Sequence, residues 1–206
     1  MTIPLEHTVQ VPSFSGYSGA TLHLAIDLAE HQRRQTVGIG PVTGHGFGGL
    51  DHLMTLPAGI PVPVDDLTEE QQKYVRRAPA AIVTVKDGQV TRHAIRPCHV
   101  VMATVRYNTT YKMALDSASR FAPFCARQVI VKRLPKDAFA RINDLAEFDF
   151  YGIGIILEKP DGSLETVVEP RLWRPMRHTA AGWWFAERAY AAYLEHTATN
   201  PAGSAA

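Results

Sequence analysis

The chain has 206 residues, of which 46% are apolar and 20% charged, and its formal net charge at neutral pH is +1. This length and composition are typical of a globular protein that buries a large core without metal or disulfide support, and they exclude a disordered or fibrous chain. A net charge so close to zero gives no global signature of nucleic-acid binding, so such a role requires local clustering of basic residues.

The sequence indicates a soluble, cytoplasmic protein. The start, "MTIPLEHTVQ", has neither the basic nor the apolar region of a signal peptide. No apolar run approaches the roughly 20 residues that a membrane span needs, so no membrane partner is expected. The two cysteines, Cys98 and Cys125, form no CxxC pair, and each lies among apolar residues. Both are expected to be reduced thiols in the core.

The N-terminal third combines a short arm with one predicted helix. Residues 1–18 combine Pro, Ser and Gly with short apolar stretches, which predicts an arm or an edge strand. In the next segment, 18–35, we expect a helix that Ser18 caps, with Glu30 and Arg34 forming an i,i+4 ion pair on its solvent side. The residues that recur there at intervals of three and four are Leu22, Ala25, Ile26, Ala29 and Arg33.

A segment rich in Gly and Pro follows, over residues 36–66. It contains seven glycines and four prolines, so we expect a long ordered loop with strand fragments at best, in which Phe47, Leu50 and Leu53 pack inward. It lacks the G-K-[ST] ending of a phosphate-binding loop and the strand–G-x-G-x-x-G–helix arrangement of a dinucleotide site. The glycine count alone therefore does not predict nucleotide binding.

Regular structure is predicted to resume at residues 65–78, where Thr68 and Gln71 form a capping box at the start of a short helix. A hairpin follows, with strands at 81–85 and 89–95 around the turn "KDG".

The rest of the chain alternates strands and helices. We expect an apolar strand over 99–107, suited to a sheet interior, and a helix and a strand after it that make a right-handed crossover between parallel strands. The segments are a helix at 111–128, a strand at 129–135, a helix at 136–148, a hairpin at 150–170, a helix at 179–196 and a disordered tail at 197–206. The predicted fold is thus α/β, with a mixed β-sheet flanked by helices.

No repeat or low-complexity linker divides the chain, so the sequence predicts a single compact domain with a Gly/Pro-rich N-terminal loop region. Within it, residues 1–65 form the arm, helix and loop packed on the core, and residues 66–196 form the α/β core.

Three passages carry a resemblance to a known family: "PAAIVTVKDGQV", "MATVRYNTTYKMALDSASRFAPFCARQVIVKRLP" and "YGIGIILEKPDG" with its basic tail. Through them, residues 66–195 resemble the restriction-endonuclease-like superfamily, the PD-(D/E)xK nucleases and their inactive relatives. The resemblance implies an acid on the hairpin and E-x-K on the next strand, which together hold a divalent ion that activates water.

The chain departs from that pattern at the metal ligands. Ala80 follows Pro79 where the acid would be, and Thr104, Val105 and Arg106 stand where E-x-K would be. A hydroxyl or a methyl group cannot replace a carboxylate as a magnesium ligand. The resemblance therefore implies a degenerate relative that binds without cutting, and no metal site is predicted.

Basic residues supply the leading functional hypothesis. Arginine forks suit phosphate oxygens and an indole face suits an exposed base. No acid occurs between Pro170 and Ala186. The candidate nucleic-acid contacts are Arg171, Trp173, Arg174, Arg177 and His178, with Lys132 and Arg133 upstream. The alternative is an ordinary surface on which these arginines pair with Glu158, Glu165 and Glu169 of the hairpin.

Two other functions stay open. A small-molecule enzyme would have its pocket under the 38–64 loop, lined by His45, His52, His93 and Tyr107, although these histidines lack any zinc spacing and indicate no particular cofactor. A protein-interaction subunit or homodimer would use the C-terminal helix, whose aromatic residues are Trp183, Trp184, Phe185, Tyr190 and Tyr193. The sequence favours a nucleic-acid-associated or regulatory binding module, with DNA or RNA as its partner.

Overall fold

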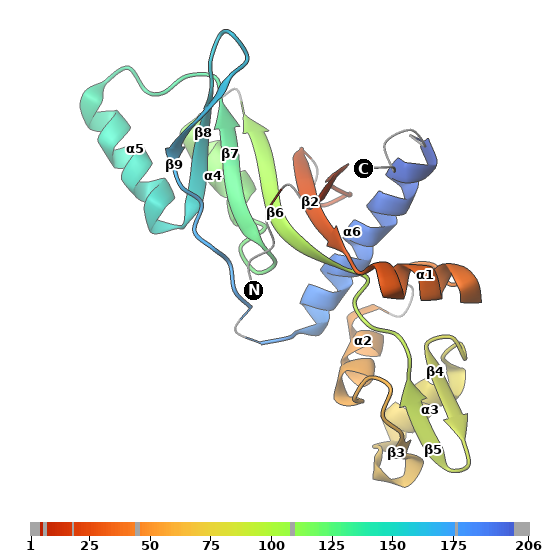
Figure 1. Cartoon of the computed structure of the whole chain (residues 1–206). Helices are drawn as coiled ribbons and strands as arrows, with labels where there is room; N and C mark the ends of the chain where they lie inside the picture. The colour runs from red at the N-terminus through yellow and green to blue at the C-terminus, as the bar shows by residue number, and fades with distance from the viewer. Residues whose placement is uncertain are drawn as a thin grey trace. The chain divides into compact units, whose positions relative to one another are not determined.

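The computed structural model describes residues 5, 8–17, 19–43, 46–107, 110–175 and 177–199, without the side chains of 46–48 (Figure 1). The described residues form an α/β structure with a mixed six-stranded sheet, a three-stranded sheet and six α-helices, which confirms the predicted fold class.

The chain divides into two compact units that alternate along the sequence. Unit 1 comprises residues 1–25, 100–176 and 192–206, and unit 2 comprises residues 26–99 and 177–191. The sequence-based division instead placed one boundary at residue 65.

The six-stranded sheet belongs to unit 1, apart from the ends of two strands. Its order is β1 (Val9–Pro12), β2 (Ala20–Ile26), β6 (Cys98–Tyr107), β7 (Ala126–Val131), β8 (Ile153–Glu158) and β9 (Leu164–Val168). Strands β6, β7 and β8 run parallel, whereas β1 is antiparallel to β2 and β9 to β8. This confirms the edge strand near the N-terminus, the parallel crossover and the second hairpin.

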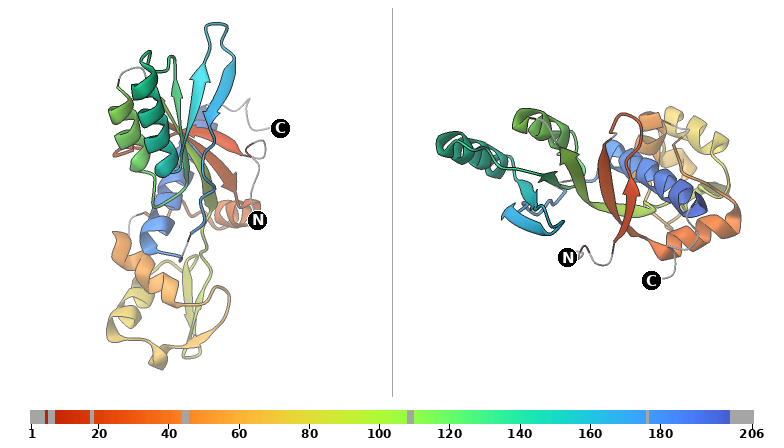
Figure 2. Two further views of the ribbon diagram at one scale, coloured as in Figure 1. Left: turned by 90° about the vertical axis from the view of Figure 1, so that its left-hand side faces the viewer. Right: turned by 90° about the horizontal axis from the view of Figure 1, so that it is seen from above.

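Two helices make the crossovers of this sheet. Helix α4 (Tyr111–Ser119) joins β6 to β7 and packs on β7 and β8, and α5 (Ala138–Phe150) joins β7 to β8 and packs on β8 and β9. Figure 2 shows the two helices side by side on the same face of the sheet. Apolar strand residues such as Val129 and Ile155 are fully buried and form the core of this unit.

Unit 2 is built on helices around a small sheet. Its elements are α1 (Leu28–Val37), α2 (Gly46–Thr55), β3 (Val62–Pro63), the 3-10 turn η2 (Val64–Asp66), α3 (Glu69–Arg77), β4 (Val83–Lys86), β5 (Gln89–Arg92) and the first part of α6 (Ala180–Thr199). The small sheet has the order β3-β5-β4. Leu50, Leu53, Val90 and Trp183 lie in its buried core.

The capping box and the first hairpin are confirmed. Thr68 accepts a hydrogen bond from the Gln71 amide, and the Gln71 side chain accepts one from the Thr68 amide. In the hairpin turn both Asp87 and Gly88 have positive φ, 51° and 73°, as a two-residue type I′ turn requires. This hairpin pairs with β3 in the small sheet, while β6 lies in the six-stranded sheet.

The helix predicted over residues 18–35 is wrong in its first half. Residues Ala20–Ile26 form strand β2, and the helix begins only at Leu28, where Asp27 caps it by accepting from the Glu30 amide. Leu22, His23 and Leu24 are all buried, because β2 lies inside the sheet and both its faces are covered. Such a strand lacks the apolar–polar alternation that would identify it. Its apolar residues also fall at intervals of three and four, which are typical of a helix. The predicted cap, Ser18, lies outside the described residues.

The segment over 36–66 is not a continuous loop, because it contains α2. Leu50, Leu53 and Leu56 are buried at intervals of three residues, which confirms the inward packing of Leu50 and Leu53 and supplies the tertiary contacts that stabilise a glycine-rich helix. The side chain of Phe47 lies outside the described set. At the other end, the predicted tail starts too early, since α6 continues to Thr199.

Candidate functional site

A cavity of about 830 Å³ lies at the carboxyl ends of β6 and β7 in unit 1. Tyr107 and Val131, the last residues of these two strands, line it together with the segments that lead into α4 and α5. In open α/β sheets, ligands bind in the crevice outside the carboxyl ends of the strands, at the point where the helices pass to opposite faces of the sheet. The cavity lies at the carboxyl ends of β6 and β7, although α4 and α5 pack on the same face (Figure 2).

Tyr111, the first residue of α4, ties the two sides of this cavity together. Its hydroxyl donates a hydrogen bond of 2.8 Å to the Arg133 carbonyl, and its ring stands edge-on to Phe148 with centroids 6.0 Å apart. Burial raises the pKa of this hydroxyl, the Asp144 carboxylate adds to the increase, and the Arg141 guanidinium opposes it. The group therefore keeps its proton and stays a donor at neutral pH.

Two side chains hold the loop between β7 and α5 in place through hydrogen bonds to backbone atoms. Arg141 donates to the carbonyls of Pro135 and Lys136, at 2.9 and 3.4 Å, and Asp137 caps α5 by accepting from the Ala140 amide at 2.8 Å. These contacts fix the course of the loop without using its cationic side chains.

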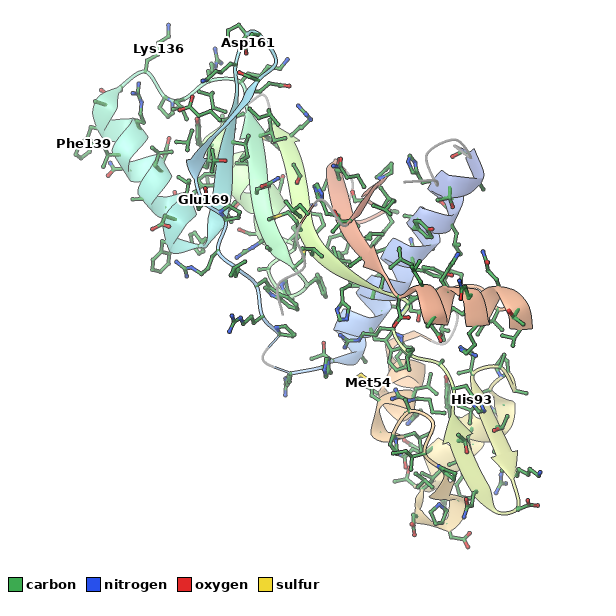
Figure 3. All side chains as sticks on the ribbon, viewed as in Figure 1. Met54, His93, Lys136, Phe139, Asp161 and Glu169 are labelled. Carbon is green, nitrogen blue, oxygen red and sulfur yellow. The ribbon has the colours of Figure 1, made fainter. Side chains whose placement is uncertain are left out.

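Four cations line the cavity beside the single carboxylate of Asp144: Lys112, Lys132, Arg133 and Lys136. All four are exposed, and within the part of the chain that the structure describes none of them takes part in an ion pair. Figure 3 shows Lys136 projecting away from the ribbon at the start of α5. Unpaired cations around one cavity give it a positive potential that attracts anions.

The start of α4 lies beside these cations. The Thr110 side chain, which precedes the helix, makes no capping hydrogen bond to the amides of its first turn. A helix N-terminus also carries a partial positive charge that favours anions.

Arg171 and Trp173, two of the predicted nucleic-acid contacts, bond to the backbone of unit 1, Arg171 next to the start of β8 and Trp173 between α4 and β7. The Arg171 guanidinium donates to the Asp149 carbonyl at 3.0 Å, and the Trp173 indole donates to the Ala122 carbonyl at 3.0 Å. At Gly152, which has φ of 68°, an added Cβ would lie 2.9 Å from the Arg171 Cβ. Both side chains therefore have structural partners within unit 1.

The structure does not bring the two basic segments together. Lys132 follows Val131, which pairs with Leu157, whereas Arg171 lies at Gly152, five residues earlier on the same strand or about 17 Å away at ~3.3 Å per residue. Lys132 and Arg133 therefore share their end of the sheet with the newly identified Lys112 and Lys136. Arg174 is exposed, and Arg177 and His178 belong to unit 2.

The carboxylates of the second hairpin have other partners. Glu158 pairs with Arg106 at 2.9 Å and Glu165 with Lys159 at 3.0 Å. Within the described ranges neither carboxylate pairs with the arginines at 171–177, so the alternative interpretation of those arginines does not hold for these two acids.

The residues predicted for a small-molecule pocket do not line one cavity. Tyr107 lines the cavity of unit 1, whereas His52 lines a separate cavity of about 510 Å³ in unit 2 and has its ring 5.5 Å from that of Tyr74. His93 bonds through Nε2 to the Thr84 hydroxyl at 2.9 Å, within the first hairpin. His45 lies outside the described residues.

Sequence reasoning missed a buried charged cluster in unit 2. Arg34 bonds to Glu30 and to Glu187, each at 2.7 Å, and Trp183 and the Val42 amide donate to Glu187 at 2.8 Å. Arg34 and Glu30 are only 1% and 3% exposed, so their predicted ion pair exists but is not on the solvent side. Burial acts to lower the pKa of Arg34, but the two carboxylates outweigh it and raise it.

An uncharged network occupies the position at which the resemblance would place E-x-K. The Thr104 hydroxyl bonds to His23 Nε2 at 3.0 Å and accepts from the Gln128 amide at 2.9 Å. Burial lowers the pKa of His23, which is therefore neutral at neutral pH. Ala80, the other position of that pattern, lies in unit 2.

Among the described residues, no three His, Cys, Asp or Glu side chains gather where they could hold a metal ion. In the same part of the chain, no helix is both long and apolar enough to cross a bilayer. Comparisons with protein-family models, with curated proteins and with solved structures found no match to this chain.

Proposed function

We propose that this protein binds single-stranded nucleic acid through its phosphate backbone at the cavity beyond the carboxyl ends of β6 and β7. The observation that carries the proposal is the set of four exposed cations, Lys112, Lys132, Arg133 and Lys136, which line one cavity and form no ion pair within the described residues. Lys and Arg side chains are the usual partners of phosphate oxygens.

The cavity also has room and surfaces for a base. Its volume of about 830 Å³ is within the range of small-molecule and cofactor sites. Tyr107 and Tyr111 are half-buried in its wall, and aromatic faces stack on nucleic-acid bases without regard to sequence. The cations, in contrast, are exposed at the surface. A nucleic-acid strand that crosses the loop between β7 and α5 while one of its bases enters the cavity would contact both the exposed cations and the two tyrosines.

A binding titration tests this proposal. A fluorescently labelled single-stranded oligonucleotide is titrated with the protein at several salt concentrations, and anisotropy gives the affinity. With three or four phosphate contacts, we expect log K to fall against log salt with a slope of roughly −2 to −3, because each neutralised phosphate in a single strand contributes about −0.7. Absence of binding at low salt would overturn the proposal.

A competition experiment distinguishes a strand from a free nucleotide. If the protein binds strands, a mononucleotide displaces the labelled oligonucleotide only at concentrations far above that of the oligonucleotide, because a mononucleotide supplies fewer phosphates. Displacement at equal concentration would identify the nucleotide as the ligand and reject the strand. The variant Tyr107→Leu, which removes one aromatic face, is expected to weaken strand binding several-fold with no change in the salt slope.

A further inference from the structure

Asp144 is the one carboxylate among the described residues that line the cavity of unit 1. It is half-buried, whereas the four cations of the cavity are exposed. It forms neither an ion pair nor a hydrogen bond with another described residue. A carboxylate only accepts hydrogen bonds, so a ligand in the cavity meets a single strong acceptor at this point.

The position of Asp144 is set by α5. It lies one turn before Phe148, which is 1% exposed, and residues four apart share a face of a helix. Phe148 in turn contacts the Tyr111 ring, and the Asp144 carboxylate raises the pKa of the Tyr111 hydroxyl. Asp144 therefore lies beside Tyr111, and a base that stacks on this ring brings one of its polar edges to the carboxylate.

The charge of the site changes sign across the cavity. A neighbouring cavity of about 550 Å³ shares Lys112 and Asp144 with the first and is also lined by Asp116 and Glu147. The cations of the loop between β7 and α5 line only the first cavity. Phosphates are therefore attracted to the loop and repelled from the space between α4 and α5. A bound nucleotide would hold its phosphate at the loop and direct its base toward Asp144.

The donor pattern of the bases decides which of them fits a carboxylate. Guanine carries two donors side by side on its Watson–Crick edge, the N1–H and the N2 amino group. On the same edge, adenine and cytosine have one amino group beside an acceptor nitrogen, and uracil and thymine have one donor between two acceptors. A carboxylate accepts two parallel hydrogen bonds from guanine and repels the acceptors of the other bases. Unstacked bases of single strands are commonly read on this edge.

We propose that the cavity of unit 1 selects guanine, and that Asp144 determines this specificity by accepting hydrogen bonds from N1–H and the N2 amino group. This inference rests on the proposed binding of single strands and adds a base preference to it. The phosphate contacts of the cations and the stacking on Tyr107 and Tyr111 do not distinguish bases. The preference therefore comes from the one acidic side chain of the cavity.

The test uses five-residue strands that carry a base only at the central position and abasic sugars elsewhere, so that no other base competes for the cavity. The central base is guanine, inosine, adenine, cytosine or thymine, and a fully abasic strand measures the phosphate contribution. Anisotropy at fixed salt should show guanine bound about tenfold more tightly than adenine, cytosine or thymine, as a bidentate contact to a base edge allows. Inosine, which lacks the N2 amino group, should fall in between.

Two variants assign the preference to its cause. Asp144→Asn should reduce the preference for guanine to less than about threefold, because the bidentate acceptor is lost. Asp137→Asn is the matched control, since Asp137 does not line the cavity and asparagine also caps a helix. It removes the same charge beside the loop, so it should strengthen binding of every strand alike and keep the preference. Circular dichroism confirms that both variants are folded.

The outcomes separate this inference from the proposed function. If all strands bind equally well whatever the central base, guanine selection is rejected while the binding of single strands stands. A full guanine preference in Asp144→Asn would show that Asp144 is not its cause and would overturn the proposal. If no strand binds at low salt, the proposed function fails and the inference fails with it.

Discussion

Units 1 and 2 use the same charged residue types in opposite ways. In unit 2, Arg34 is 1% exposed and binds two carboxylates, so its charge is neutralised within the fold. In unit 1, Lys132 and Arg133 are exposed beside a cavity, and within the described residues neither has a carboxylate partner. The difference shows that the partners of a cation, rather than its type, decide whether it stabilises the protein or remains available to a ligand.

The buried cluster gives the largest expected effect. Arg34→Met should lower the free energy of unfolding by roughly 3–5 kcal/mol, because it leaves Glu30 and Glu187 buried without their main partner. Urea denaturation followed by tryptophan fluorescence measures it. The matched control is Arg106→Met, which removes an ion pair whose arginine side chain is 60% exposed and should cost less than about 1 kcal/mol. Equal losses would contradict the contrast between the units.

Unit 1 depends on close backbone packing at the start of β8. Gly154→Ala should destabilise the protein by roughly 1–3 kcal/mol, because its Cβ would lie 2.8 Å from Pro170 Cδ. Gly40→Ala is the control, since a Cβ added there would have no atom within 4 Å. The same denaturation experiment applies, and a loss for Gly40→Ala as large as for Gly154→Ala would show that the clash is not the cause.

Acid should act on unit 1 through His23. Burial lowers the pKa of this imidazole below its ordinary value of 6.5, so the folded chain binds fewer protons than the unfolded chain. Its contribution to stability is therefore present above about pH 6.5 and is lost as the pH falls below that value. His23→Gln should reduce the pH dependence of unfolding between neutral and mildly acidic pH. An unchanged dependence would show that His23 does not cause it.

The reaction rates of the two buried thiols measure how often each unit opens. Burial raises the pKa of Cys98 in unit 2, and it raises the pKa of Cys125 in unit 1 to about 12. Neither should react with a thiol reagent at mildly alkaline pH until its unit opens. The single-cysteine variants Cys98→Ala and Cys125→Ala separate the two rates. Immediate reaction of either thiol in the folded chain would contradict its burial.

The sequence predicted features that depend on neighbouring residues. The capping box of Thr68 and Gln71 and the turn at Asp87 and Gly88 need only local contacts, and both formed as expected. Strand β6 was also predicted correctly, because a long apolar run fits the middle of a sheet.

Features that depend on distant contacts were not predictable. Strand β2 lacks an alternating pattern because side chains on both of its faces are buried. Helix α2 forms among glycines because its leucines enter a core assembled from four other elements. The pairing of Arg34 with Glu187 joins residues 153 positions apart. No local pattern indicates such a pair.

Only some residues of the candidate site could be identified from the sequence. Lys132 and Arg133 were identified as basic residues, and Tyr107 as a pocket residue, but they were assigned to different hypotheses. Lys112 and Lys136 join them only because β6 and β7 are parallel and end at the same edge of the sheet.

The most direct test of the central claim compares two double charge reversals that change the net charge equally. One is Lys132→Glu with Arg133→Glu at the cavity, and the other is Arg120→Glu with Arg174→Glu, two exposed arginines that do not line it. Affinity for a labelled single-stranded oligonucleotide is measured by anisotropy at fixed salt. We predict that the cavity variant binds at least about tenfold more weakly, while the control changes by less than about threefold. Equal losses in both variants, or no loss in the cavity variant, would contradict the claim that the unpaired cations of unit 1 form the binding site.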